Sequence, residues 1–337
     1  MLRTTGNGEI GAAALPASLA WPSPERLRDE DRLRWLEVGR CPACGCGRIA
    51  SRRALPGAGY AFGDERIGFP ASGIGVAVCA QCDLVYKTVV PQPAFLSEVF
   101  ARQAGKKWME AYDFSIDFPE LRRFAGGEIA DVLDVGAGNG ALLEACAKAG
   151  VRGRRSALDV LAHPGLDQCL AGEFIAGFVD AATLEWSRRP YHVVTLFDVL
   201  EHLYFPRLAF RNLRALVRDG GLVFIETGNV ESHWPRRYGL EEWWYVRLFE
   251  HHLFWSRTSL ERLVDEHGFR VVSWEERRHK SRAAAPAIRT TRDLLKVGLY
   301  CASPVTYTGL AGMLGKEGAQ PWSPFTRDHI RVCLQKV

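Results

Sequence analysis

Short apolar runs alternate along the second half of the chain with stretches in which apolar residues recur every three or four positions. The apolar runs predict strands over residues 131–135, 156–160, 173–179, 192–197, 222–226, 269–274 and 329–337. The stretches between them predict helices over residues 141–149, 208–217, 258–267, 288–300 and 308–315. Thr258 and Glu261 have the spacing of a capping box for the third of these helices. Strands alternating with helices predict an α/β fold with a doubly wound, mostly parallel, seven-stranded sheet.

The first third of the chain lacks this alternation. Residues 1–34 are rich in Gly, Ala, Pro and charge, which predicts a flexible arm, with a short helix over 29–38 at its end. Residues 35–93 hold strand-like runs at 75–78 and 84–90 and form a separate small unit. A linking helix is expected over 94–123. The α/β domain then covers 124–337, with an insertion at about 277–325.

Composition narrows the class of protein. The chain has 337 residues, of which 47% are hydrophobic and 24% charged, so two globular domains fit and wholesale disorder is excluded. No apolar run reaches the roughly 18–20 residues that span a bilayer, and with no export signal we expect a cytoplasmic protein. A net charge of +4 does not indicate nucleic acid. The basic residues at 277–296 are either a solvated face or a contact for an anionic substrate or partner.

Four of the nine cysteines form two Cys-x-x-Cys pairs, Cys41 with Cys44 and Cys79 with Cys82. Each pair makes a turn that aims two thiolates at one point, and together they predict a structural Cys₄ zinc site in a zinc-ribbon-like unit. The 35 positions from Cys44 to Cys79 exceed the usual spacer and count against zinc. Cys46 is a substitute ligand, and four reduced core cysteines are the alternative. Zinc would contribute about 10–16 kcal/mol of apparent free energy.

A glycine loop, Gly136-Ala137-Gly138, joins the first strand of the α/β domain to its first helix. Glycines permit a tight turn and a close approach to a ligand. Asp134 precedes this loop by two positions. Because a carboxylate repels a pyrophosphate, the loop favours a cationic ligand, such as a sulfonium that carries an amino-acid ammonium.

Acids follow the next three strands. Asp159 ends the second strand, 21 residues after Gly138, where a carboxylate can accept bonds from two ribose hydroxyls. Asp180-Ala181 follows the third strand, where a carboxylate and a backbone N–H can bind an adenine edge. Asp198 follows the fourth strand, with Glu201 and His202 just beyond it.

The motifs VLDVGAGNG, ALDV, FVDAATL, VVTLFDVLEHL and GGLVFIETGN, in this order, resemble the class I S-adenosylmethionine-dependent methyltransferases. The resemblance implies a Rossmann-like fold and S-adenosylmethionine as the cofactor. By position it implies that Gly136 and Gly138 line the methionine part, that Asp159 holds the ribose and that Asp180 holds the adenine. The full set of expected cofactor-binding residues is Asp134, Gly136, Ala137, Gly138, Asp159, Val160, Asp180, Ala181 and Asp198.

Two further resemblances concern the cysteine pairs and the segment that follows the fourth strand. The cysteine pairs are similar to the zinc-binding segment of sugar C-methyltransferases and related enzymes from polysaccharide and secondary-metabolite clusters. The segment from Asp198 to His202 also resembles ubiquinone-type O-methyltransferases, in which acids at this point are linked to a divalent cation. One implication of this resemblance is a divalent cation at the active site, bound by Asp198, Glu201 and His202. A capping or supporting role is the alternative for His202.

The expected catalytic residues are His251 as the base, then His202, with Glu201 beside it. His251 follows six aromatic residues between 234 and 249, which either cover a flat acceptor or belong to the core. We predict methyl transfer to a small molecule, by O-methylation of a sugar, lipid-linked or secondary-metabolite acceptor. C- or N-methylation of a sugar, a non-catalytic cofactor-binding protein and an RNA methyltransferase that grips RNA with the zinc unit are alternatives. The modest charge disfavours RNA, and a homodimer is left open.

Overall fold

The computed structural model describes residues 29–103, 114, 117–163, 165–277, 287–303, 306–307, 310 and 327–337. Most of the expected flexible arm and the helix expected at 308–315 lie outside the described residues. Among the residues described, no helix is both long and apolar enough to cross a membrane.

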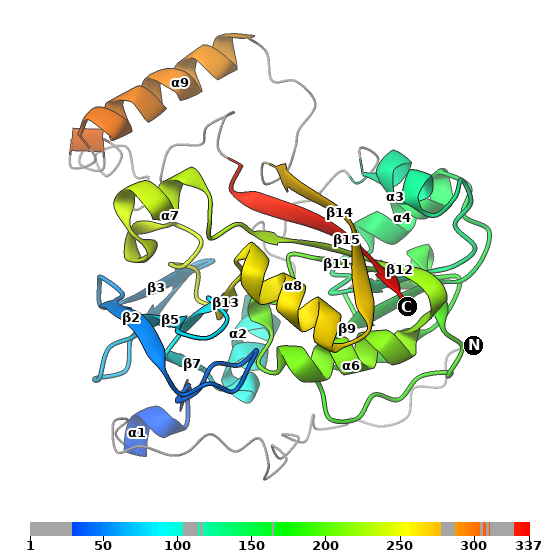
Figure 1. The fold of residues 1–337 in the computed structure, drawn as a ribbon, viewed down its shortest axis with the longest axis horizontal. Coiled ribbons are helices and arrows are strands. Elements are labelled where there is room, and N and C mark those ends of the chain that lie inside the picture. Colours follow the sequence, from blue (N-terminus) through cyan, green and yellow to red (C-terminus); the bar gives the residue numbers. More distant parts are fainter. Residues whose placement is uncertain are drawn as a thin grey trace.

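A seven-stranded sheet forms the centre of the molecule (Figure 1), and its strand order is β10-β9-β8-β11-β12-β15-β14. The first five strands are parallel, and β15 is antiparallel to both of its neighbours. The strands are β8 (Val132–Val135), β9 (Arg155–Asp159), β10 (Phe174–Ala176), β11 (Tyr191–Phe197), β12 (Val217–Gly228), β14 (Phe269–Arg277) and β15 (His329–Lys336). The predicted doubly wound, mostly parallel α/β sheet is confirmed.

Helices cover the two faces of this sheet. Alternate side chains of a strand point to opposite faces, and β8 accordingly places Val132 in one apolar cluster and Leu133 in the other. One face is covered by α3 (Phe118–Phe124), α4 (Ala141–Lys148) and α5 (Leu166–Cys169). The opposite face is covered by α6 (Pro206–Leu216) and α8 (Arg257–Glu266), which lie in front of the sheet in Figure 1.

The cysteine-containing unit is joined to the α/β domain by a shared sheet. Its order is β13-β6-β5-β2, with strands β2 (Ile49–Ala54), β5 (Gly75–Cys79), β6 (Val85–Lys87) and β13 (Leu253–Phe254). Strand β13 comes from the second half of the chain and pairs antiparallel with β6, Leu253 opposite Tyr86. The apolar core is continuous across this junction. The strand pairs β1 (Trp35–Glu37) with β7 (Val89–Pro91), and β3 (Gly59–Phe62) with β4 (Glu65–Gly68), complete the unit.

Two local predictions are wrong. The helix expected over 29–38 is only α1 (Asp29–Arg32), because Trp35 is buried and its strand pairs with β7. Of the linking helix expected over 94–123, the structure describes the two ends, which are helical as α2 (Pro93–Gln103) and α3, whose second residue is Pro119; most residues between them are outside the described ones. The capping box of α8 is made by Ser256 and Ser259, because the helix starts at Arg257 and Ser259 therefore occupies its third position.

The insertion between β14 and β15 holds α9 (Ala287–Ala302), close to the expected 288–300. This helix stands at the edge of the molecule in Figure 1, where Tyr300 packs against Trp234 and Tyr238 of α7 (His233–Tyr238). The short 3₁₀ turns η3 (Leu200–His202) and η4 (Leu240–Glu242) follow β11 and α7.

Candidate functional site

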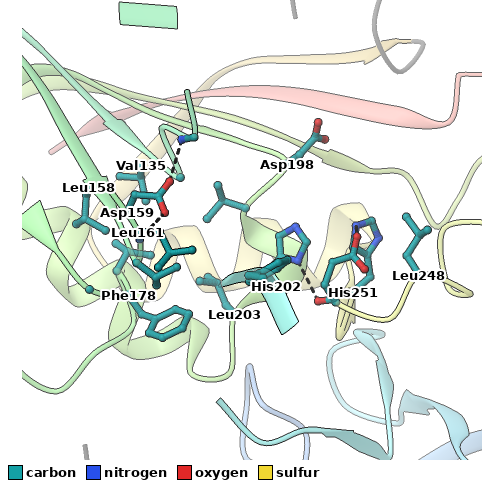
Figure 2. Close-up of a pocket in the computed structure, with 18 of the residues that line it drawn as sticks. Val135, Leu158, Asp159, Leu161, Phe178, Asp198, His202, Leu203, Leu248 and His251 are labelled. Atoms are coloured by element: carbon teal, nitrogen blue, oxygen red, sulfur yellow. Dashed lines mark hydrogen bonds and ion pairs between the residues drawn. The ribbon is translucent and has the colours of Figure 1, made fainter. Parts of the chain in front are cut away.

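A cavity of about 470 Å³ opens at the carboxyl ends of β8, β9 and β11 (Figure 2). In an open α/β sheet this edge is where ligands bind. Figure 2 shows Asp159 and Phe178 at one end, and His202, His251 and Leu248 at the other. The predicted site residues that line it are Gly136, Gly138, Asp159, Val160, Asp198, His202 and His251.

The glycine loop binds directly to Asp159. Gly136 and Gly138 have φ angles of 71° and 52°, in the left-handed region that glycine tolerates. The N–H of Gly138 donates to Oδ2 of Asp159 at 2.8 Å, and the N–H of Leu161 donates to Oδ1 at 3.1 Å. A carboxylate has about four lone-pair sites, so Asp159 is held in place and keeps acceptor capacity for a ligand.

Substitution of Gly136 by alanine is expected to weaken cofactor binding about tenfold or more. A Cβ at this position would lie 2.4 Å from Cγ2 of Val199, which lines the cavity. Val199 or the loop would have to move to avoid this overlap, and the cavity wall would change shape. Gly150→Ala is the matched control, because Gly150 has a φ of 88° with no atom within 4 Å of the added carbon. Both variants share the left-handed strain, of about 1–2 kcal/mol. Calorimetry with S-adenosylhomocysteine measures the difference, and equal affinity in both variants would contradict this role of Gly136.

Two predicted acids lie behind the cavity wall. Asp134 is buried and accepts a bond from the Thr195 hydroxyl at 2.7 Å, and burial raises its pKa to about 7. Asp180 is also buried, and its Oδ2 accepts the N–H groups of Tyr204 at 2.7 Å and Phe205 at 2.8 Å. These two N–H groups precede α6, so Asp180 anchors the start of that helix. Neither acid is among the cavity-lining residues.

The two predicted alanines are likewise outside the lining. Ala137 is buried, and the carbonyl of Ala181 accepts the Asn212 side chain at 2.9 Å. The structure therefore brings Asp159, Val160 and the two glycines to the cavity, and it does not bring Asp134, Ala137, Asp180 or Ala181 to its wall.

Glu201 lies between two histidines at the other end of the cavity. Its Oε1 is 3.9 Å from Nε2 of His202 and 3.9 Å from Nε2 of His251. Nδ1 of His202 donates to the Glu250 carbonyl at 2.9 Å, and Nδ1 of His251 donates to the Tyr245 carbonyl at 3.1 Å. Because a carbonyl only accepts, the proton of each neutral ring is on Nδ1. The lone pairs on the two Nε2 atoms therefore face Glu201.

The neighbours of Glu201 affect its pKa. The carboxylate of Glu201 accepts hydrogen bonds from the hydroxyl of Thr227, at 2.7 Å, and from the hydroxyl of Tyr245. Burial, and after it the charge of Asp198, raises the pKa of Glu201 to about 7. Burial is the main cause that lowers the pKa of His251 well below its usual range, and electrostatic repulsion by the neighbouring His202 ring, whenever that ring carries a proton on both nitrogens, adds to it. His251 is thus neutral at physiological pH, with a lone pair free to bind a proton or a cation.

The ligand atoms of Glu201, His202 and His251 lie within 4.8 Å of one another, a donor set that fits a divalent cation. The sequence had placed Asp198 with Glu201 and His202. In the structure Asp198 has a left-handed φ of 54°, and its Oδ1 lies 3.8 Å from Nε2 of His329. His251, which comes from a distant turn, takes the third place in the cluster.

The four predicted cysteines converge. The sulfurs of Cys41 and Cys82 are 3.5 Å apart, as are those of Cys44 and Cys79, and all four lie within 4.8 Å. Ligands at 2.3 Å from a tetrahedral zinc are about 3.8 Å apart, so the cluster is consistent with zinc. Cys46 lies outside the cluster, and its sulfur accepts a hydrogen bond from the N–H of Arg48 at 3.3 Å.

Both cysteine turns use the same backbone conformation. Gly45 and Asp83 have φ angles of 73° and 60°, and their N–H groups donate to the carbonyls of Cys41 and Cys79. Asp83 therefore adopts the left-handed conformation that glycine has in the first turn. The difference in sequence between the turns does not change their geometry.

Two arginines of the α/β domain hold the cysteine turns. Arg207 of α6 donates to the carbonyl of Ala43 at 3.3 Å, and Arg262 of α8 donates to that of Gln81 at 3.3 Å. Glu266 pairs with both arginines. A zinc ion with four thiolates would carry a net negative charge, and the two arginines lie where they would stabilise it.

The six aromatic residues before His251 divide between core and cavity. Trp243, Phe249 and Trp234 are buried in the core, and Tyr238 packs against α9. Only Trp244 and Tyr245 of the six line the cavity. The stretch therefore contributes partly to the core and partly to the cavity wall, and a role in covering an acceptor stays a prediction for Trp244 and Tyr245.

Several lining residues were not predicted, namely Phe100, Leu161, His163, Phe178, Leu248 and Glu250. Phe178 and Leu161 lie beside predicted acids, and Glu250 precedes His251, so proximity in sequence was an available signal for these. Phe100 belongs to α2, far from the motifs, and no local pattern marks it. Burial raises the pKa of Glu250, while the charges of His202 and Lys87 oppose that shift.

Comparison with known proteins supports the same architecture. A family model described as a methyltransferase domain matches residues 96–274. The ubiquinone biosynthesis O-methyltransferase of Bordetella avium (strain 197N) is 38% identical over 103 residues, which are 29% of this chain and 42% of that protein. That of Vibrio vulnificus (strain YJ016) is 30% identical over 145 residues, 40% of this chain and 61% of that protein. The chain thus spans about half the length of these curated relatives.

Two solved structures are similar to this chain at low sequence identity. A putative methyltransferase in complex with the Haloferax volcanii Trm112 activator has a TM-score of 0.48 at 16% identity, covering 71% of this chain and 96% of that one. The Burkholderia thailandensis 1,6-didemethyltoxoflavin-N1-methyltransferase has a TM-score of 0.45 at 15% identity, covering 72% and 88%. With a family model that matches more than half of its residues, the chain belongs to the class I S-adenosylmethionine-dependent methyltransferases.

Proposed function

We propose that this protein transfers the methyl group of S-adenosylmethionine to a hydroxyl of a small-molecule acceptor. The observation that carries the proposal is a cavity with the glycine loop and Asp159 at one end and His202 and His251 at the other, where the buried Glu201 lies behind the two histidines. Methyl transfer is an in-line displacement, so an enzyme accelerates it mainly by holding both reactants in one geometry.

The cofactor end supplies positioning. Asp159, held by Gly138 and Leu161, has lone pairs for ribose hydroxyls. Leu161 and Phe178 lie beside it in Figure 2 and offer apolar surface for a purine ring. Asp134 behind the loop can balance the positive charge of the cofactor, since a nearby cation favours its ionised form.

The acceptor end supplies the group that removes the hydroxyl proton. The neutral His251 has its Nε2 lone pair directed into the cluster, so it can accept that proton. The same donors fit a divalent cation, and both histidines carry the Nδ1–H bond to a carbonyl that metal-binding histidines use. Such a cation would lower the pKa of a bound hydroxyl. The two roles of His251 exclude each other, and dependence on added metal distinguishes them.

The class of acceptor is inferred from the side chains that line the acceptor end of the cavity and from the relatives. Trp244 and Tyr245 present aromatic surface to the cavity, and Phe100 adds to it. These side chains suit a planar or amphipathic small molecule. The curated relatives named as O-methyltransferases support oxygen as the accepting atom.

Replacement of His251 by asparagine is expected to slow methyl transfer about 10²- to 10⁴-fold, the usual contribution of a proton-transferring group. The assay follows the labelled methyl group of S-adenosylmethionine into a panel of phenols, sugars and RNA. His233→Asn is the matched control, because His233 is exposed on α7. Affinity for S-adenosylhomocysteine should stay close to that of the wild type in both variants. Transfer to RNA in preference to every small molecule would contradict the proposal.

A further inference from the structure

The turn from Leu248 to His252 carries three of the groups that face the acceptor end of the cavity: Leu248, Glu250 and His251. It belongs to no helix or strand and lies between the buried aromatic stretch and β13. A segment without regular structure needs other bonds to hold its side chains in one place.

One residue of the cysteine unit holds both ends of this turn. The side-chain Nζ of Lys87 donates to the Leu248 carbonyl at 2.5 Å, and the backbone N–H of Lys87 donates to the His252 carbonyl at 2.9 Å. The third fixed point is the Glu201 carbonyl, which accepts the N–H of His252 at 2.7 Å. The turn is therefore closed between Lys87 on one side and the Glu201 segment on the other.

Lys87 is buried, with only 1% of its surface exposed, and its ammonium lies over the Tyr60 ring at 4.5 Å. Taking an ammonium out of water is costly unless its hydrogen bonds are satisfied. The bond to Leu248 satisfies part of this requirement, and the ring contributes a cation–π contact. Burial lowers the pKa of Lys87 to about 7, and the bond to Leu248 forms whether or not the amine is protonated, so the side chain contributes more than packing.

The cysteine cluster sets the position of Lys87. Strand β5 ends at Cys79, the turn to β6 contains Cys82, and Lys87 is the last residue of β6. Strand β13, which follows the turn at residue 253, pairs with β6 in the same sheet. Any ligand that holds Cys79 and Cys82 together thereby fixes the strand from which Lys87 reaches the acceptor end.

We propose that Lys87 is a positioning residue for methyl transfer, which holds the turn from Leu248 to His252 so that Glu250 and His251 face the acceptor. This inference rests on the proposed function for the identity of the reaction. Through Lys87 it also gives the cysteine unit, which is far from the cofactor loop in sequence, a role in the active site.

The test compares Lys87→Met with Arg53→Met. Methionine keeps the length and burial of the lysine stem but lacks the ammonium. Arg53 contacts Glu241 at 3.3 Å and also joins the cysteine unit to the α/β domain, but at an exposed position away from the turn. Both variants keep the backbone bond of residue 87, so Lys87→Met removes only the bond to Leu248 and the contact with the Tyr60 ring. If Lys87→Met does not fold, Lys87→Gln, whose amide is too short to reach Leu248, is measured instead.

Spectra of protein labelled with ¹⁵N in its histidine rings give the direct readout, with signals assigned through His251→Asn and His202→Asn. We expect the His251 signals to shift in Lys87→Met, together with those of His202, whose Nδ1 bonds to Glu250 in the turn. With the acceptor found in the transfer assay, kcat should fall about tenfold or more, while KM for S-adenosylmethionine stays within about threefold. Arg53→Met should match the wild type in both measurements.

Unchanged histidine signals in Lys87→Met would overturn the positioning role. So would a loss of cofactor affinity equal to the loss of turnover, since that pattern indicates general destabilisation. Failure of the wild type to bind S-adenosylhomocysteine would instead count against the proposed function, so the two failures are distinguishable.

Discussion

Replacement of Cys79 by serine is expected to remove about one zinc ion per chain and to unfold the cysteine unit. Structural zinc contributes about 10–16 kcal/mol of apparent folding free energy, more than the whole stability of many domains. The Cys₄ geometry described above fits zinc, and Cys79 also ends the strand that pairs with β2 and β6. Metal content is measured by atomic emission after dialysis, and unfolding by circular dichroism.

We expect the unit to depend on a bound metal because its apolar core is not separate from that of the α/β domain. Every residue of β2 is exposed, and the buried apolar residues of the unit belong to one cluster that continues into the α/β domain. Loss of zinc should also free β13 and the turn that carries His251, so acceptor methylation should fall together with metal content.

Cys46→Ser is the matched control, because Cys46 lies two positions from Cys44 but outside the cluster. It should keep the zinc and the fold. A wild-type preparation that is free of metal and stably folded would refute the zinc assignment. Loss of zinc in Cys46→Ser but not in Cys79→Ser would show that a different set of cysteines binds it.

Asp159→Ala is expected to weaken the binding of S-adenosylhomocysteine by about 100-fold or more. The substitution removes the acceptor for the N–H groups of Gly138 and Leu161 as well as the proposed ribose contact. Each hydrogen bond to a charged group contributes about 1.5–3 kcal/mol, and every tenfold change in affinity corresponds to about 1.4 kcal/mol. Loss of the two proposed bonds to ribose hydroxyls therefore accounts for the expected loss of affinity. Calorimetry measures it directly.

Asp167→Ala controls for the loss of one negative charge near the cavity, because Asp167 is exposed on α5. Its affinity should equal that of the wild type. Asp159→Asn, which keeps one acceptor oxygen, should fall between the wild type and Asp159→Ala. Equal affinity of Asp159→Ala and the wild type would contradict both the ribose role and the proposed position of the cofactor.

The strands and the cofactor loop could be predicted because their signals are local. A strand buried on both faces must be apolar along its whole length, as β11 is, and a left-handed φ at Gly136 requires glycine. The end of β9 and the start of the loop meet because neighbouring parallel strands end at one edge of a sheet. Asp159 was therefore placed correctly at the cavity from the order of the motifs alone.

The acids Asp134 and Asp180 show where such reasoning stops. Their positions at strand ends are as expected, but Thr195 and the N–H groups before α6 bind their carboxylates. Which side of a strand end faces the cavity depends on how the following segment packs. A motif marks the position of a side chain in the chain and does not reveal its hydrogen-bond partners.

By itself the sequence determined the order of the strands and helices, the seven-stranded α/β sheet, the convergence of the four cysteines and the cofactor loop. All of these depend on spacing between neighbours or on a repeated local pattern. Only the tertiary structure brought Lys87 to Leu248, 161 positions away, and His251 to Glu201. These contacts form because β13 adds to the sheet of the cysteine unit. A two-residue strand has almost no local signal, so its pairing is decided by the packing of the whole chain.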